Sequence, residues 1–174
     1  MTVLAGFILG AARLFGRLKV PDIVKSVLGG VIFGVVGVAL PLTMFSGGDQ
    51  LKTELSRAGT LGVGLLVAAL IGKMLTFGVS LGSGFVGGPI FPSLFIGGTA
   101  GIIVHQVVHS VPLGLAFTCL LAAVPGALAP APFAMVLIAA FLTQVGALQS
   151  APILIAVVTA FLTMEGVKFF LACR

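Results

Sequence analysis

The chain has 174 residues, of which 59% are hydrophobic and 7% are charged, and its formal net charge is +5. Soluble domains are on average about 45–50% apolar and about 25% charged, whereas no Asp, Glu, Lys or Arg occurs here between Met74 and Met164. Because a soluble surface needs charged groups, these values exclude a water-soluble enzyme and a disordered chain. They predict an integral membrane protein.

Six of the nine Lys and Arg residues lie near the first hydrophobic segment or at the far end of the chain, and they form no single nucleic-acid-binding patch. They are Arg13, Arg17, Lys19, Lys25, Lys168 and Arg174. Clusters of Lys and Arg beside membrane segments mark cytoplasmic loops, because these residues resist translocation. We therefore expect no nucleic-acid partner and a multi-pass protein of the plasma membrane of a bacterium.

Seven apolar runs lack the alternation of β-strands and predict membrane helices. In chain order they are Val3–Leu18, Val24–Leu42, Leu61–Ser80, Phe91–His109, Pro112–Val124, Pro132–Val145 and Pro152–Leu171. An amphipathic segment, Asp49–Ala58, lies between the second and third runs, and its Glu54 and Arg57 predict a solvated face. Crossing the hydrocarbon core takes about 20 residues, so several of these helices are too short to cross at an ordinary tilt.

Prolines and glycines mark the predicted breaks between helices. The breaks fall at Pro21, Pro41, Gly82–Pro92, Pro112, Pro125, Pro130–Pro132 and Pro152. Pro92, Pro112, Pro132 and Pro152 are predicted helix starts, because a first-turn residue does not need its N–H. Short hydrophobic segments interrupted by Gly and Pro are typical of transporters whose broken helices hold a binding site near the membrane midplane.

The stretch from Gly82 to Gly98 leads through glycines into a helix that starts with a proline. The first turn of a helix has N–H groups with no partner inside the helix, and it carries the positive end of the helix dipole. In a membrane this makes an anion site without a full charge, from which an ion can also leave. The alternative is a flexible loop between two spans.

At these residues the chain resembles a known family. Gly82-Ser83-Gly84-x-x-Gly87-Gly88-x-x-x-Pro92-Ser93-Leu94-Phe95-Ile96-Gly97 resembles the pore-helix signature of the CLC family of chloride channels and chloride/proton antiporters. The resemblance extends over most of the chain and includes Lys25 with Gly29-Gly30, Lys73 with Thr76, and Ala131-Pro132-Phe133.

The resemblance implies an all-α integral membrane fold of broken and tilted helices. Residues 1–174 would form the second of two inverted repeats of a CLC-type membrane domain, with no soluble domain. It implies chloride transport, with the backbone N–H groups of Ile90 and Phe91, after Gly88, facing the ion. The pore motif would comprise Gly82, Ser83, Gly84, Gly87, Pro89 and Pro92.

The same resemblance implies partners and cofactors. The bilayer and chloride are the expected partners, together with a second copy of the chain or a first-half repeat. Helices around Pro132–Val145 and Pro152–Thr163 would contribute to the dimer interface. No cofactor is expected beyond the transported chloride, and no metal.

The chain departs from the family pattern at several points. The family usually has Gly-x-Phe-x-Pro where this chain has Gly88-Pro89-Ile90-Phe91-Pro92, and Pro89 has no N–H to donate. The family's Glu-Leu-Thr appears here as Phe141-Leu142-Thr143. The gating glutamate belongs to the first repeat and the pore tyrosine to the final helix, and the chain contains no Tyr. We expect Glu165 at the interface and not in a proton relay.

Three further residues have more than one interpretation. Lys73, an intramembrane charge, would either add positive potential to an anion path or bind backbone carbonyls at a broken helix. His105 and His109 have a spacing that can hold a metal, but without other ligands nearby we expect an interfacial location.

The sequence has no catalytic triad and no phosphate-binding loop, so we expect no enzyme.

Three functions remain open from the sequence. The favoured one is the pore-forming second half of a CLC-type chloride channel or chloride/proton antiporter. The second is a non-conducting membrane fragment that dimerises with CLC subunits. The third is an unrelated inverted-repeat transporter of organic anions.

Overall fold

The computed structural model describes residues 2–43, 51, 54–58, 61–85, 87–129, 131–146 and 150–172. Throughout these ranges the regular structure is helical, and no strand is present. The chain divides into an N-terminal unit, Val3–Pro92, and a C-terminal unit built on Ser93–Arg174. This confirms an all-α membrane fold, and each unit is described by itself below.

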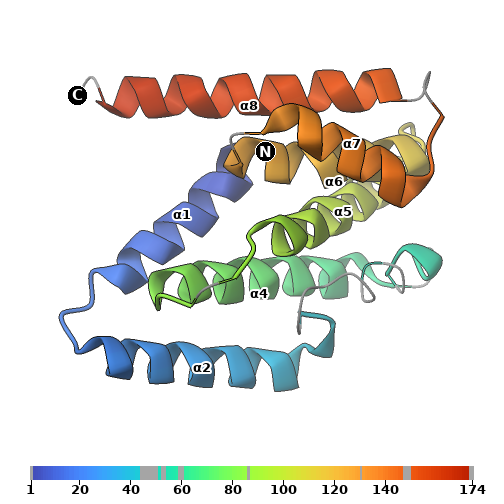
Figure 1. Cartoon of the computed structure of the whole chain (residues 1–174). Coiled ribbons are helices and arrows are strands. Elements are labelled where there is room, and N and C mark those ends of the chain that lie inside the picture. The colour runs from blue at the N-terminus through green and yellow to red at the C-terminus, as the bar shows by residue number, and fades with distance from the viewer. Residues whose placement is uncertain are drawn as a thin grey trace. The chain divides into compact units, whose positions relative to one another are not determined.

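In the part of the chain that the structure describes, the N-terminal unit contains three helices of 15 to 20 residues and a short turn (Figure 1). They are α1 (Thr2–Gly16), α2 (Asp22–Ala39), the 3-10 turn η1 (Pro41–Thr43) and α4 (Val63–Gly82). Helix α2 packs along α4. Two glycines of α4 admit α1: a Cβ at Gly78 would lie 2.7 Å from the Ala11 Cβ, and one at Gly82 would lie 2.7 Å from the Ala12 carbonyl oxygen.

The C-terminal unit contains most of α5 (Ile90–Val107), followed by α6 (Leu113–Leu128), α7 (Pro132–Thr143) and α8 (Ser150–Ala172). Helix α6 packs against both α7 and α8. Small residues bring these helices close: a Cβ at Gly101 would lie 2.6 Å from the Phe117 Cα, and one at Gly126 would lie 2.8 Å from Val157 Cγ1. Without a hydrophobic driving force between helices in lipid, such close packing holds a membrane fold together.

All seven predicted helices are present, and the four prolines predicted to start helices lie at the beginnings of α5, α6, α7 and α8. Pro132 is the first residue of α7, and Pro112 is the N-cap of α6. Pro92 and Pro152 are the third residues of α5 and α8, where a missing N–H costs no intrahelical bond. The predicted break at Gly82–Pro92 is also confirmed, since α4 ends at Gly82 and α5 begins at Ile90.

The predicted break at Pro125 is wrong. Helix α6 continues through Pro125 to Leu128, and the Pro125 carbonyl accepts the Ala129 N–H at 2.8 Å. Pro125 lies in the last turn of α6, so its missing N–H removes a helical hydrogen bond only near the end of the helix. Membrane helices tolerate such a proline where neighbouring groups satisfy the freed carbonyl.

The amphipathic segment Asp49–Ala58 falls largely outside the described residues, which here are 51 and 54–58. Arg57 is exposed, as expected, but Glu54 is 0% exposed. The predicted solvated face is therefore wrong for Glu54. Glu54 and Ala58 are four residues apart, and both are buried. The side of the segment that carries the Glu54 carboxylate is therefore buried.

Four helices are long and apolar enough to cross a membrane, among the residues that the structure describes. They are Asp22–Ala39, Val63–Gly82, Ile90–Val107 and Ser150–Phe170. Three shorter apolar helices accompany them, Val3–Gly16, Leu113–Leu128 and Pro132–Thr143. The prediction that several helices are too short to cross at an ordinary tilt is confirmed, as broken-helix architectures require.

Candidate anion-binding site

A pocket of about 340 Å³ lies within the N-terminal unit, where α2 and α4 meet the connection to α5. It is lined by Gly30 and Phe33 of α2, by Lys73, Thr76, Phe77, Ser80 and Leu81 of α4, and by Phe85, Gly87, Gly88 and Pro92. The lining is mainly apolar, with one cation and two hydroxyls. An apolar pocket with a few polar groups is the usual form of a small-ligand site.

The connection from α4 to the pocket turns sharply at Gly84. Its φ of +79° lies in the left-handed region, which glycine adopts without steric cost. The Phe85 N–H then donates to the Ser80 carbonyl at 3.2 Å, which folds the chain back over the end of α4. This turn directs Gly87 and Gly88 into the pocket wall.

Gly87 and Gly88 have open space where a side chain would stand. A Cβ added at either would meet nothing within 4 Å. These two glycines are therefore not explained by packing in the described part of the chain. They leave the backbone ahead of α5 accessible from the pocket, which a backbone-based anion site requires.

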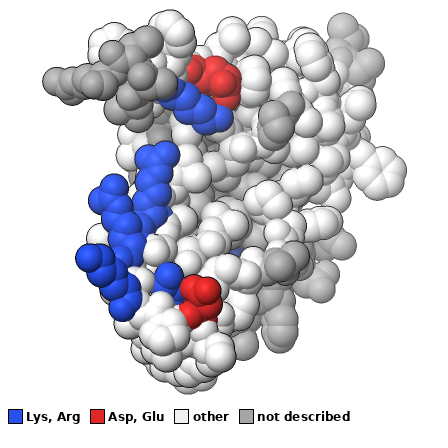
Figure 2. Space-filling model, turned by 60° about the vertical axis from the view of Figure 1, so that its left-hand side comes forward, with Lys and Arg blue, Asp and Glu red and all other residues white. Residues whose placement is uncertain are grey.

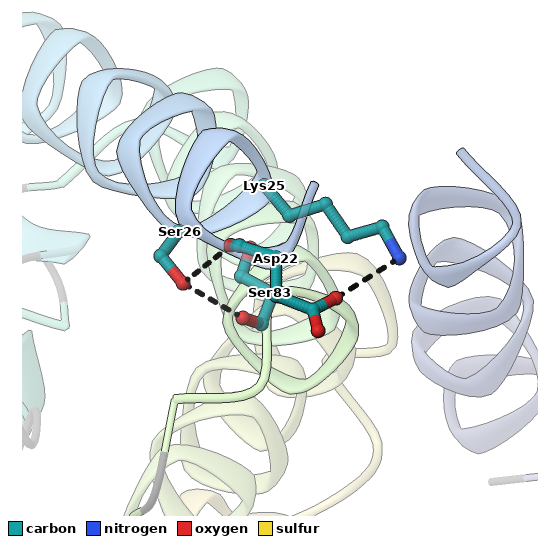
Figure 3. A network of polar contacts seen from close by, with 4 residues as sticks. All are labelled: Asp22, Lys25, Ser26 and Ser83. Carbon is teal, nitrogen blue, oxygen red and sulfur yellow. Dashed lines mark hydrogen bonds and ion pairs between the residues drawn. The ribbon is translucent and has the colours of Figure 1, made fainter. Parts of the chain in front are cut away.

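The crossing of α2 and α4 fixes the point from which this connection starts. The Ser26 Oγ lies 3.2 Å from the Ser83 carbonyl oxygen and 3.1 Å from that of Asp22, so its single proton serves two acceptors (Figure 3). Beside it, a Cβ at Gly29 would collide with the Ser83 Oγ. Gly29 thus allows α2 to approach Ser83, and Ser26 ties the two helices at that point.

Lys73 is 2% exposed and lines the pocket. Its Nζ donates to the Thr43 carbonyl oxygen at 2.8 Å, which joins α4 to the 3-10 turn after α2. Of the two interpretations, binding of a backbone carbonyl at a broken helix is confirmed. Its place in the pocket wall also puts a cationic side chain at the candidate site, so the two roles are compatible.

The predicted pore residues occupy different places around this pocket. Three of them line it: Gly87, Gly88 and Pro92. Three shape the approach or its packing: Gly82, Ser83 and Gly84. Pro89 directly precedes α5, and Ile90 and Phe91 are its first two residues, but these three are not in the pocket lining. That the N–H groups of Ile90 and Phe91 face an anion stays a prediction.

Sequence reasoning missed several residues that the fold brings to this site: Ser26, Phe33, Phe77, Ser80, Leu81 and Phe85. Ser26 is 57 residues away from its partner Ser83. The signal that could have found it is the Lys25-to-Gly30 motif, in which Ser26 lies one turn before the glycine pair.

The remaining polar candidates lie apart from the pocket lining. The Nδ1 of His105 is 2.7 Å from the Val111 carbonyl oxygen. Glu165 is exposed on α8 and pairs with Lys168 at 2.6 Å, in keeping with a solvated position. Within the described ranges, no three His, Cys, Asp or Glu residues are grouped as metal ligands.

The helices define a multi-pass membrane protein, and its pocket lies beside the break between α4 and α5. The model of the family described as voltage gated chloride channel matches residues 3–165. The chain belongs to this family.

Curated relatives share part of the chain. It is 36% identical over 108 residues to a protein of Salmonella newport (strain SL254) named "Putative ion-transport protein YfeO". Proteins of the same name from Salmonella agona (strain SL483) and Salmonella typhimurium (strain LT2) match equally. The match covers 62% of this chain and 26% of each relative, so the chain spans about a quarter of the relatives' length. No solved structure matches it.

Proposed function

We propose that the chain forms part of the chloride path of a CLC-type transport protein, with the pocket ahead of α5 as its anion site. The observation that carries this proposal is the meeting of Gly87, Gly88 and Pro92 with the buried Lys73 in one pocket wall. Family membership favours chloride as the anion, because the family is described as voltage gated chloride channel.

The chemistry of the pocket suits weak anion binding. The α5 N-terminus supplies a positive dipole end, and the Lys73 ammonium already donates to a carbonyl oxygen. The Thr43 carbonyl takes up one of the three N–H donors of the Lys73 ammonium, which limits the hydrogen bonds that this ammonium can give an anion. Conduction needs an ion to leave as readily as it enters.

Chloride titration of the purified chain tests the site. We expect saturable binding, with bromide competing and small carboxylates not competing. A carboxylate that displaces chloride would instead support an organic-anion transporter. Absence of chloride binding would overturn the proposal.

Flux measurements then separate transport from binding. Proteoliposomes that hold the chain, alone and with a first-half CLC repeat, would be loaded with chloride and assayed for efflux. Efflux in either preparation supports a transport role. Binding without efflux in both supports the second candidate, a non-conducting chain that pairs with CLC subunits.

We further propose that the chain pairs within the membrane, as a homodimer or with a first-half repeat. Phe133, Leu137 and Phe141 of α7 are largely exposed and recur every four residues, which places them along one helical face. Such a face is covered by lipid or by another helix. A bacterial plasma membrane is the proposed location, since the matched relatives are bacterial, and no cofactor is proposed beyond chloride.

A further inference from the structure

The corner between α1 and α2 combines several cations with a short turn. We call Arg13, Arg17, Lys19 and Lys25 the basic corner. Arg13 lies in the last turn of α1, and the Arg17 N–H donates to the Arg13 carbonyl at 3.1 Å, so the helical path continues just past Gly16. Arg13, Arg17 and Lys19 are exposed. Figure 2 shows Lys and Arg side chains gathered at the left of the view.

The basic corner has little negative charge to neutralise it. Asp22 approaches Lys25 at 3.6 Å, and its side chain is otherwise open to solvent. Arg13, Arg17 and Lys19 have no ion pair among the salt bridges of the described residues. The corner therefore presents a surplus of positive charge.

Exposed apolar side chains alternate with these cations. Leu14 is 74% exposed, Leu18 is 42% exposed and Ile23 is 79% exposed. A surface that offers cations and aliphatic side chains together fits the boundary between lipid headgroups and acyl chains. There, long basic side chains reach the phosphates while apolar side chains stay in hydrocarbon.

The start of α2 adds a further feature to the corner. Its N-cap is Pro21, and no side-chain hydrogen bond caps this end of the helix. The positive end of the α2 dipole therefore adjoins Lys19 and Lys25. Helix N-termini and basic side chains both favour phosphate oxygens.

We propose that the basic corner binds the headgroup phosphate of an anionic phospholipid, whose acyl chains lie against Leu14, Leu18 and Ile23. The occupant is a lipid and not a soluble phosphate, because the apolar side chains of the corner would otherwise face water. The location agrees with the cytoplasmic leaflet that clustered Lys and Arg predict, where anionic lipids attract basic segments. This inference does not depend on the chloride site.

Native mass spectrometry of the purified chain, with phosphatidylglycerol and phosphatidylcholine of identical acyl chains, tests the proposal. We expect the chain to retain phosphatidylglycerol preferentially. Each cation near a charged membrane surface contributes roughly a fivefold gain in affinity. The combined variant Arg13→Gln, Arg17→Gln and Lys19→Gln should therefore lose roughly a hundredfold of the preference.

Lys168→Gln is the matched control, because it removes an exposed Lys outside the corner that pairs with Glu165. It should leave the preference unchanged. Equal retention of the two lipids by the unaltered chain, or an unchanged preference in the triple variant, would overturn the proposal. If the triple variant does not fold, as judged by its helical circular dichroism, Arg17→Gln alone should lose about fivefold.

A second arm separates lipid from free phosphate. Leu14→Ser combined with Ile23→Ser should weaken retention of phosphatidylglycerol, because it removes the surface proposed for the acyl chains. Glycerol 3-phosphate should not displace the lipid at concentrations at which phosphatidylglycerol does. Displacement by glycerol 3-phosphate at equal concentration would make the corner a soluble-phosphate site and overturn the lipid assignment.

Discussion

Glycines at the helix contacts of the C-terminal unit and glycines beside the pocket of the N-terminal unit meet opposite surroundings. In the C-terminal unit, Gly97, Gly101 and Gly126 lie where a Cβ would strike the neighbouring helix. In the N-terminal unit, Gly87 and Gly88 face open space beside the pocket. The same residue type therefore permits close packing at helix contacts, which occur in both units, and leaves the backbone accessible just ahead of α5. Substitutions should damage stability in the first case and anion binding in the second.

The largest expected effect is at Gly101. Gly101→Leu should lower the free energy of unfolding by about 3 kcal/mol, because its Cβ would already lie 2.6 Å from the Phe117 Cα. Denaturation of the purified protein in increasing SDS would measure this. Gly114→Leu is the control, since a Cβ at Gly114 meets nothing within 4 Å. Equal loss in both variants would contradict the assignment of Gly101 to close packing.

Lys73→Met should have the second largest effect on stability. It removes the donor to the buried Thr43 carbonyl oxygen and should cost about 2 kcal/mol of stability. It should also weaken chloride binding, because the pocket loses its cation. Lys168→Met, which breaks an exposed ion pair, should change stability by less than about 1 kcal/mol. A stable Lys73→Met variant with unaltered chloride binding would remove Lys73 from both roles.

Gly88→Leu tests the open glycines in the same way. The added side chain enters open space next to the pocket, so stability should change by less than about 0.5 kcal/mol. Chloride affinity should fall at least about tenfold, which corresponds to about 1.4 kcal/mol. Chloride titration of Gly88→Leu and of the control Gly114→Leu measures the difference. Normal binding by Gly88→Leu would place the ion elsewhere.

Ser26→Ala should loosen the start of the connection to α5. Loss of its hydrogen bond to the Ser83 carbonyl should cost about 1 kcal/mol, and amide hydrogen exchange should rise at Gly84, Phe85 and Gly88. Thr159→Ala is the control, because the Thr159 hydroxyl donates only within α8 in the hydrogen bonds described. Unchanged exchange at Gly84 in the Ser26 variant would show that the bond does not hold the connection.

Pro89→Ala should have the smallest effect and the opposite sign. It restores a backbone donor just ahead of α5, and one hydrogen bond contributes about 1 kcal/mol, or roughly a fivefold gain in chloride affinity. Pro152→Ala in the first turn of α8 restores a donor at a residue that does not line the pocket, and it should leave binding unchanged. An unchanged isotherm for Pro89→Ala would indicate that Pro89 lies away from the ion.

Local chemistry made much of the fold predictable. Pro112 and Pro132 start helices because proline suits a first turn and cannot donate. The rule that proline begins or breaks a helix fails at Pro125, which lies within α6. Its position there depends on buried neighbours that no local pattern reveals. Glu54 defeated the rule that charges face solvent, because the helical face that carries it is buried.

The backbone segment of the candidate site could be predicted, but most of the side chains that surround the pocket could not. The glycines and Pro92 identify the approach to α5, because few residues other than glycine allow the turn that Gly84 makes. Phe33 and the Thr43 partner of Lys73 could not be predicted, since each comes from a segment far along the chain. The motif around Ser26 likewise does not reveal its contact with Ser83. Their roles follow from which helices pack together.

The sequence by itself determined that this is a helical membrane protein, because hydrophobicity, charge distribution and proline positions act locally and do not depend on tertiary contacts. The resemblance to the CLC family came from the motif between Gly82 and Gly97, and the family match confirms it. Only the tertiary structure decided which glycines are packed and which are open, and which carbonyl engages the buried lysine. The physical reason is that glycine has no side chain that would favour either a packed or an open position. Whether it admits a neighbouring helix or exposes the backbone depends on what the fold brings opposite it.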